Sequence, residues 1–319
     1  MDTHEHHRRE HGHALDHGHG HGHGHHHAPA AYGRAFGIGA GVNLVFAVAE
    51  FGFGFAANSV ALIADATHNV GDVLGLLLGW LAVWLHRRPP RGRRTYGWGR
   101  FSIAAALGNA AILLVSAGAI LMEAAHRLHD PAPVASGTVM IVAGIGILVN
   151  GGSALLFLRG RHGDLNVRAQ YLHLAGDAAV SACVVIAALA IRLTGLHWID
   201  PAISAAIAAI VAWSTIGALR EAADMAMDAV PARVSRAAVG DFLAGLPGVE
   251  EVHDLHIWAL STTETALTVH LVCADAQAGR RPHDVAAELR HRFGIGHATL
   301  QIENGADAAL CHLRPNDVV

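Results

Sequence analysis

The sequence predicts an α-helical membrane protein with six transmembrane helices, followed by a small α+β domain. Only 15% of its 319 residues are charged, whereas about a quarter are charged in a typical soluble domain. The mean hydropathy is correspondingly high, at +0.35. Apolar runs of about twenty residues, enough to cross a bilayer, recur near residues 35–56, 60–85, 101–124, 134–158, 171–193 and 198–219.

The placement of arginine predicts how these spans are oriented. The link between the second and third spans, HRRPPRGRRTYGWGR, is densely basic, and so is RGRHGDLNVR between the fourth and fifth. The other links carry one Arg or none. Because basic loops stay in the cytoplasm, we expect a multi-pass protein of the cell (inner) membrane with both termini cytoplasmic. Three cysteines without a disulfide framework fit soluble parts in a reducing compartment.

Changes in composition divide the chain into four parts. Residues 1–33 are expected to form a His-rich, disordered cytoplasmic tail, and residues 34–220 the six-helix transmembrane domain. Residues 229–305 are expected to form a cytoplasmic metal-binding and dimerisation domain, and residues 306–319 a flexible C-terminal tail. The first tail could be an expression tag, but its alternating Gly favours a metal-collecting segment, since imidazole is a good zinc ligand.

The cytoplasmic part has a helix–strand–strand–helix–strand pattern. A helix near residues 234–246 ends at Pro247-Gly248, and the strands EVHDLHIWAL and TALTVHLVCA follow, separated by STTE. The helix RPHDVAAELRHRF then leads into the strand HATLQIE. This order predicts an αββαβ, ferredoxin-like domain with two helices on one face of the sheet.

Two spans carry the same polar pair. His68 and Asp72 lie four residues apart, as do His173 and Asp177, so each pair shares a helix face. A carboxylate at the centre of a membrane helix costs about 2.5–3.5 kcal/mol. Two imidazoles and two carboxylates form an N₂O₂ ligand set suited to Zn²⁺, which would neutralise that charge. The alternative, hydrogen bonding between helices without metal, would not require the same spacing and order twice.

Several motifs in order resemble the cation diffusion facilitator family, with the bacterial zinc exporters as the nearest type. The resemblance extends from about residue 32 to residue 303 and rests on SVALIADATHNVGD, YGWGRF, LHLAGD, WIDPAIS, HDLHIWAL and HATLQIE. It implies a homodimer in the lipid bilayer that exports Zn²⁺ in exchange for H⁺ by alternating access. The transport site that it implies consists of His68, Asp72, His173 and Asp177, and the first His favours zinc over cadmium or manganese.

The resemblance also implies a zinc site in the cytoplasmic domain. The residues that it assigns there are His253, His270, His283 and Glu303. Gln301 is a poor zinc ligand, which argues against a complete two-metal cluster, while Cys311-His312 could add a thiolate. His256 and Trp258 should lie on the opposite strand face from His253, because strand side chains alternate, and packing is expected there.

Other polar residues are expected to support these sites. Asp65 shares the face of His68 and could be a fifth ligand, although the resemblance favours a supporting role. Arg100 and Asp228 match positions at which relatives link the membrane edge to the cytoplasmic domain by an ion pair. Asp200-Pro201 is read as a helix N-cap. Asn43 and Glu50 share a helix face, and they either bond neighbouring helices or line a water-filled path.

The sequence therefore predicts a Zn²⁺/H⁺ antiporter, with export of Co²⁺, Cd²⁺ or Fe²⁺ as the alternative. Zn²⁺ is expected as the substrate and as a structural or regulatory ion, and no other cofactor is expected. A net charge of −4 does not suggest nucleic-acid binding. An intramembrane metallohydrolase is a remote alternative, because HExxH is absent and four protein ligands leave no open metal position. A metal sensor is disfavoured because no signalling module is appended.

Overall fold

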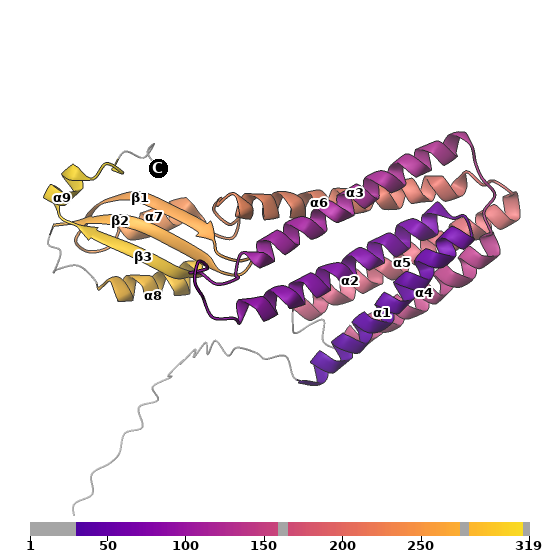
Figure 1. Ribbon diagram of the computed structural model, residues 1–319, viewed down its shortest axis with the longest axis horizontal. Coiled ribbons are helices and arrows are strands. Elements are labelled where there is room, and N and C mark those ends of the chain that lie inside the picture. Colours follow the sequence, from indigo (N-terminus) through magenta and orange to yellow (C-terminus); the bar gives the residue numbers. More distant parts are fainter. Residues whose placement is uncertain (1–29, 159–164, 275–280, 315–319) are drawn as a thin grey trace, which may run out of the picture. The chain divides into compact units, whose positions relative to one another are not determined.

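The computed structural model describes residues 30–158, 165–274 and 281–314 (Figure 1). Along the chain, six long helices precede a small domain with a three-stranded sheet, in the order that the sequence predicts. Residues 1–29 of the predicted His-rich tail, and 315–319 at the other end, lie outside the described residues.

Six apolar helices form the transmembrane region, which confirms the predicted six spans. Five have the length and hydropathy of a spanning helix, and the first contributes the apolar stretch Gly41–Ala56. Large apolar side chains such as Val115, Met122 and Trp213 are exposed, as lipid contact requires. The helices are α1 (Ala30–Ala56), α2 (Val60–His86), α3 (Phe101–His129), α4 (Ser136–Phe157), α5 (Leu165–Thr194) and α6 (Ile199–Ala226) (Figure 1).

Small side chains allow these helices to pack closely. In α3 the buried residues Ile103, Ala110, Ala117 and Ala124 repeat every seven positions, so they share one helix face. Such faces let helix backbones approach each other in a membrane, where van der Waals packing drives association. The most extensive helix contacts join α3 to α6 and α4 to α5.

Asp200 does not have the role that its sequence context predicts. Helix α6 begins at Ile199, and Asp200 is not its N-cap. The buried Asp200 carboxylate instead accepts hydrogen bonds from the Ser59 hydroxyl at 2.5 Å and from the Val60 backbone N–H at 2.7 Å. Ser59 is the N-cap of α2. Asp200 therefore caps a neighbouring helix, since unpaired N–H groups at a helix N-terminus favour a carboxylate.

The cytoplasmic domain has the predicted αββαβ order and one additional short helix. Strand β2 lies between β1, which is antiparallel to it, and β3, which is parallel to it. The parallel pair is joined by α8, the crossover that parallel strands need. The elements are α7 (Arg236–Ala244), β1 (Val249–Ala259), β2 (Thr265–Cys273), α8 (Pro282–Phe293), β3 (Ile295–Glu303) and α9 (Gly305–Leu310) (Figure 1).

One hydrophobic core joins the sheet to both helices. It contains Val239 and Leu243 from α7, Leu267 and Leu271 from β2, and Leu289 from α8, all buried. Side chains at alternate positions of β2 point away from this core. The prediction that two helices cover one face of the sheet is therefore confirmed, and the other face is left for polar residues.

A β-bulge in β1 changes which side chains share that polar face. His253 pairs with His270, but His256 pairs with Thr268, so three residue steps in β1 match two in β2. Asp254, within the bulge, has a positive φ of 50°. His270 and Thr268 point to the same face, because they are two residues apart in one strand. Trp258 pairs with Ala266, two residues from Thr268 in β2, so it lies on this face too. The prediction that His256 and Trp258 lie on the opposite face from His253 is therefore wrong.

A short helix follows β3, where the sequence suggested a flexible tail from residue 306. Helix α9 begins at Gly305, because the Asn304 side chain accepts hydrogen bonds from the backbone N–H groups of Ala306 and Asp307, both at 2.9 Å. This is an N-cap, which fixes the first turn of a helix. The helix brings the following residue, Cys311, back to the sheet.

Candidate metal sites

The four side chains predicted for the transport site meet between α2 and α5. The Nε2 atom of His68 lies 3.4 Å from Oδ1 of Asp177, and Nε2 of His173 lies 3.3 Å from Oδ2 of Asp72. Within each helix, the imidazole and the carboxylate four residues further on are 3.6 and 3.7 Å apart. Each imidazole therefore contacts carboxylates from both helices.

Burial and unpaired atoms make this group suitable for a cation. The ligand atoms of His68, Asp72 and Asp177 lie within 4.8 Å of one another. Asp177 is buried, while His173 lies at the edge with 41% of its side chain exposed. The buried Nδ1 atom of His68 has no hydrogen-bond partner among the described residues. Such atoms are costly in an apolar interior unless an ion or a proton takes them.

A cavity of about 850 Å³ lies beside the four-residue group. His68, Asp72 and His173 line it, and so do His86 at the end of α2 and Thr262 in the turn between β1 and β2. The cavity thus extends from the middle of α2 to the C-terminal end of this helix, just before the basic loop. Between these ends its wall includes the small residues Gly75, Gly79, Ala82, Ala105, Ala106 and Ala110.

Asp65 lies near the group without joining it. Its carboxylate accepts a hydrogen bond from the Ser181 hydroxyl of α5 at 2.8 Å, which links α2 to α5. Similarly, the Asn69 amide donates to the Glu50 carboxylate at 3.1 Å, which links α2 to α1. Both carboxyl groups are completely buried. The contacts favour a supporting role for Asp65 over a fifth ligand, and they give Glu50 the role of bonding neighbouring helices.

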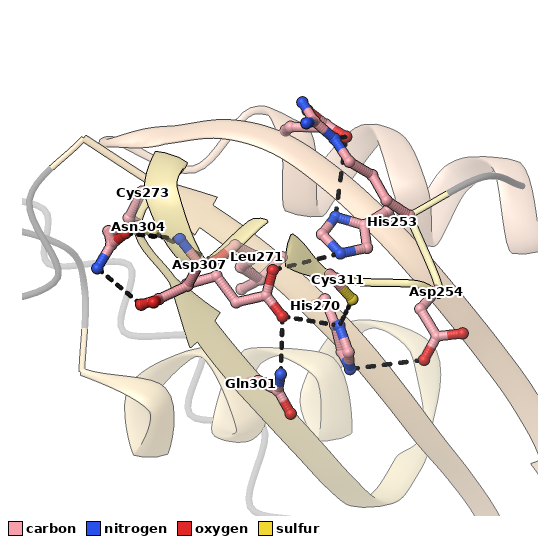
Figure 2. Close-up of polar contacts among 12 residues, drawn as sticks. His253, Asp254, His270, Leu271, Cys273, Gln301, Asn304, Asp307 and Cys311 are labelled. Carbon is pink, nitrogen blue, oxygen red and sulfur yellow. Dashed lines mark hydrogen bonds and ion pairs between the residues drawn. The ribbon is translucent and has the colours of Figure 1, made fainter. Parts of the chain in front are cut away.

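A second group of ligating side chains lies on the polar face of the cytoplasmic sheet. The ligand atoms of His253, His270, Glu303 and Cys311 lie within 4.8 Å of one another. Glu303 joins the two imidazoles, with 3.4 Å to His253 and 3.0 Å to His270. The Cys311 thiol lies 3.6 Å from Nδ1 of His270, and Figure 2 shows His253, His270 and Cys311 facing one another.

The residues of this cytoplasmic group suit zinc. His253 and Glu303 are buried, and the ring nitrogens of His253 contact the carboxylates of Glu303 and Glu251 at 3.4 and 3.8 Å without well-formed hydrogen bonds. Two imidazoles, a carboxylate and a thiolate are all ligands that zinc accepts in closed structural sites. These four residues would therefore hold such an ion, which would neutralise the buried charge and link the three strands to the segment after α9.

Neighbouring polar residues orient the cytoplasmic ligands. The Gln301 amide donates a hydrogen bond to Glu303 at 2.7 Å, so Gln301 orients the Glu303 carboxylate, a candidate ligand (Figure 2). Asp254, turned by the bulge, lies 3.5 Å from Nε2 of His270. Partners of this kind fix the orientation of ligating imidazoles and carboxylates. Sequence analysis missed Asp254, because an alternating pattern does not reveal a bulge.

An ion pair lies beside this group. The Arg314 guanidinium donates two hydrogen bonds to the Glu251 carboxylate, at 2.7 and 3.0 Å, and these bonds lower the pKa of Glu251 below its ordinary value. Cys273, by contrast, is buried in the core on the other side of the sheet, and burial raises the pKa of its thiol. Cys273 is therefore a packing residue.

Comparisons with known proteins identify both parts of the chain. The family model for the cation efflux transmembrane domain matches residues 38–225, and the model for the cation efflux protein cytoplasmic domain matches residues 231–305. The chain belongs to the cation diffusion facilitator family. The predicted family is thereby confirmed for both the membrane and the cytoplasmic part.

Curated relatives of this cation diffusion facilitator cover most of its length. The metal cation efflux system protein CzcD of Cupriavidus metallidurans is 36% identical over 79% of this chain and 81% of its own. The zinc transporter ZitB of Escherichia coli is 34% identical over 81% of this chain and 84% of its own length. The cadmium, cobalt and zinc/H(+)-K(+) antiporter of Bacillus subtilis is 30% identical over 81% of this chain and 86% of its own length.

Membership of this family settles the broad class of function. The protein is a multi-pass membrane transporter for metal cations and not an enzyme, as the sequence predicted. The remote alternative, an intramembrane metallohydrolase, is thereby excluded.

One residue predicted for the cytoplasmic site of this transporter lies apart from the others. His283 is in the first turn of α8 with 94% of its side chain exposed, and its Nδ1 atom lies 3.9 Å from the Asp284 carboxylate. It is not among the ligand atoms gathered around Glu303, whereas Cys311 is. Within one chain, the expected four-residue set therefore has Cys311 in place of His283. The reason is that α8 packs on the hydrophobic face of the sheet, whereas His253, His270 and Glu303 lie on the polar face.

Two contacts join the start of α3 to residues that follow α6. Arg100 pairs with Asp228, as the resemblance implied, although both side chains are 55% exposed, so the pair adds little stability. The Ser102 hydroxyl accepts a hydrogen bond from the Thr262 backbone N–H at 3.0 Å. The second contact could not be predicted from the sequence, because it depends on where the turn between β1 and β2 lies.

Proposed function

We propose that this transporter exports Zn²⁺ from the cytoplasm in exchange for H⁺ by alternating access. The observation that carries the proposal is the meeting of His68, Asp72, His173 and Asp177 beside a cavity that extends to the end of α2. The arginine-rich loop after α2 supports a cytoplasmic position for that end. The cavity would then load cytoplasmic metal, in a protein of the inner membrane with both termini cytoplasmic.

Competition between metal and protons explains the coupling. A zinc ligand must be a neutral imidazole or an ionised carboxylate, so metal binding displaces protons from His68, His173 and their partner carboxylates. A free imidazole has a pKa near 6.5, so a pH difference between the two sides of the membrane can change its protonation state. On the cytoplasmic side the four side chains would release protons and take up Zn²⁺. On the more acidic outer side protons would return and release the metal.

The choice among metals rests on the ligand chemistry. Two imidazoles with two carboxylates suit Zn²⁺ well, but Co²⁺, Cd²⁺ and Fe²⁺ accept the same donors, so export of one of these is the alternative. The B. subtilis relative is named for cadmium, cobalt and zinc, and its name includes K⁺ beside H⁺. Transport should therefore be compared for each metal, with and without K⁺ on the opposite side.

The cytoplasmic domain would have a structural or regulatory role. We propose that His253, His270, Glu303 and Cys311 hold a resident Zn²⁺, and that two copies of the chain associate through this domain. The cytoplasmic family model, known as the ZT_dimer domain, supports a homodimer. A resident ion suits this group because its ligands are more buried than those of the transport site.

Zinc flux into everted vesicles under an imposed proton gradient tests the proposal. We expect uptake by the wild type, which collapses when the gradient is dissipated, and no uptake by His68→Ala or Asp177→Ala. His129→Ala and Asp130→Ala are matched controls at the far end of α3, where both residues are exposed. Flux that persists in Asp177→Ala at the wild-type rate would refute the assignment of the site. Flux that ignores the proton gradient would refute antiport with H⁺.

A further inference from the structure

The loop between α2 and α3 concentrates positive charge at the end of a transmembrane helix. Five arginines follow His86 within eight residues, at positions 87, 88, 91, 93 and 94. In the part of the chain that the structure describes, none of their side chains pairs with a carboxylate. Guanidinium groups that lack such partners favour an anionic ligand.

The backbone of the loop turns back on itself. Gly92 has a φ of +55°, and the Arg94 N–H donates to the Arg91 carbonyl at 3.1 Å, which closes a tight turn. Gly97 has a φ of +70°, and a side chain there would stand 3.6 Å from the Arg88 carbonyl oxygen. Glycine tolerates both conformations without strain. The second turn therefore brings the end of the loop back against its beginning.

The folded loop encloses a pocket of about 430 Å³. Its lining consists of Arg88, Pro89, Arg91, Arg94, Gly97 and Trp98. The guanidinium of Arg94 stacks 3.7 Å from the ring centre of Trp98, and that of Arg88 lies 4.0 Å from the ring centre of Trp84. Stacking orients a guanidinium plane and leaves its N–H edge free for hydrogen bonds.

The position of the pocket indicates which anion it meets. Trp80 and Trp84, in the last turns of α2, are 68% and 45% exposed, as in the aromatic belts at membrane interfaces. The loop begins at Arg87, three residues after Trp84, so its arginines lie at the level of the lipid headgroups. Basic residues just beyond a transmembrane helix attract anionic lipids. A divalent metal would be repelled by the same charges.

We propose that this pocket binds the phosphate of an anionic phospholipid headgroup, with Arg88, Arg91 and Arg94 as its donors. A phosphodiester offers oxygens that guanidinium groups bind in pairs, and the exposed tryptophans would lie beside the acyl chains. The site is separate from both metal sites and does not depend on which metal is transported.

Lipid binding to the purified full chain tests the proposal. Binding of phosphatidylglycerol and phosphatidylcholine would be measured by native mass spectrometry, for the wild type and for Arg88→Gln/Arg91→Gln/Arg94→Gln. Each interfacial Arg contributes about fivefold to lipid affinity, so we expect the triple variant to bind phosphatidylglycerol about 100-fold more weakly. The control is Arg236→Gln/Arg281→Gln/Arg290→Gln, which removes the same charge from exposed positions of the cytoplasmic domain. We expect it to keep the wild-type affinity.

A milder substitution and a competing ligand show whether the pocket itself holds the headgroup. Arg94→Lys keeps the charge but loses the stacking on Trp98, so about fivefold weaker binding would support the pocket. Because this single change is mild, it also serves if the triple variant fails to fold. Equal losses in the triple variant and its control, or equal affinity for phosphatidylcholine, would overturn the proposal. Displacement of phosphatidylglycerol by millimolar inorganic phosphate would identify free phosphate as the ligand and would also overturn it.

Discussion

The candidate membrane site and the candidate cytoplasmic site offer similar ligating side chains on different structural elements. In the membrane, each helix supplies one imidazole and one carboxylate four residues apart, and the two helices cross-pair at 3.3–3.4 Å. In the cytoplasmic domain, β1, β2, β3 and the segment after α9 each supply one ligand. Only the first arrangement follows from spacing within single elements. The second depends on strand register and on where a short helix ends.

Exposure also differs between the two sites in a way that suits their proposed roles. His173 is 41% exposed beside a cavity, whereas His253 in the cytoplasmic group is 2% exposed. A transported ion must be released in every cycle, so its ligands need access to water. A resident ion is held more firmly by buried ligands and by a thiolate.

The largest effect is expected from a change that breaks the membrane site alone. Asp72→Asn keeps the shape of the side chain but removes the negative charge of the carboxylate, which contacts His68 of α2 and His173 of α5. Zinc transport should therefore fall at least about 100-fold, which corresponds to about 2.8 kcal/mol. The zinc content of the cytoplasmic domain should not change. Vesicle flux and metal analysis of the purified protein measure the two effects, with Asp130→Asn as control. Equal loss at both sites would show that the two are not independent.

An intermediate effect is expected from the cytoplasmic site. Cys311→Ser should weaken zinc binding there by about 10–100-fold, because a hydroxyl is a poor replacement for a thiolate. His283→Ala should leave the affinity unchanged within one chain, since His283 points into solvent. Competition with a zinc chelator would rank the two variants. A larger loss of zinc affinity in His283→Ala than in Cys311→Ser would place His283 in the site, for example through contact between two copies of the chain.

The smallest effect concerns pH and the pair Glu251–Arg314. The pKa of Glu251 is lowered in the folded state, so the stability that the pair adds is present above the ordinary pKa of Glu and is lost as pH falls through the lowered value. Glu251→Gln should therefore reduce stability slightly at neutral pH and leave it unchanged in strong acid. Thermal unfolding between pH 7 and pH 3 would measure this, and a difference that grows toward acid would contradict it.

These contrasts show how far the sequence could predict the structure. The six spans, the αββαβ order and the meeting of His68, Asp72, His173 and Asp177 follow from hydropathy and from helical spacing. Helix periodicity fixes the relative positions of side chains four residues apart, whatever surrounds the helix. For this reason the membrane site was predictable residue by residue once two matching pairs were found.

The remaining features depend on contacts between distant segments. The bulge at Asp254 moves His256 to the polar face, and no residue pattern announces it. Asp200 caps α2, not α6, because the two helix ends lie side by side in the fold. Cys311 reaches the cytoplasmic site because α9 turns the chain back. The sequence could single out His256, Asp200 and Cys311 but not Asp254, and it could not say which partner each would meet.

The capping of α2 by Asp200 has a consequence for alternating access. This bond fastens α2 to α6 at the end farthest from the basic loop, so we expect that end to act as the pivot when α2 tilts. With a rise of about 1.5 Å per residue, Asp72 lies about 18 Å and His86 about 39 Å from the pivot. A tilt of about 10° would then move Asp72 by about 3 Å and His86 by about 7 Å. A small rotation would thus separate the four candidate ligands and displace the distant entrance about twice as far.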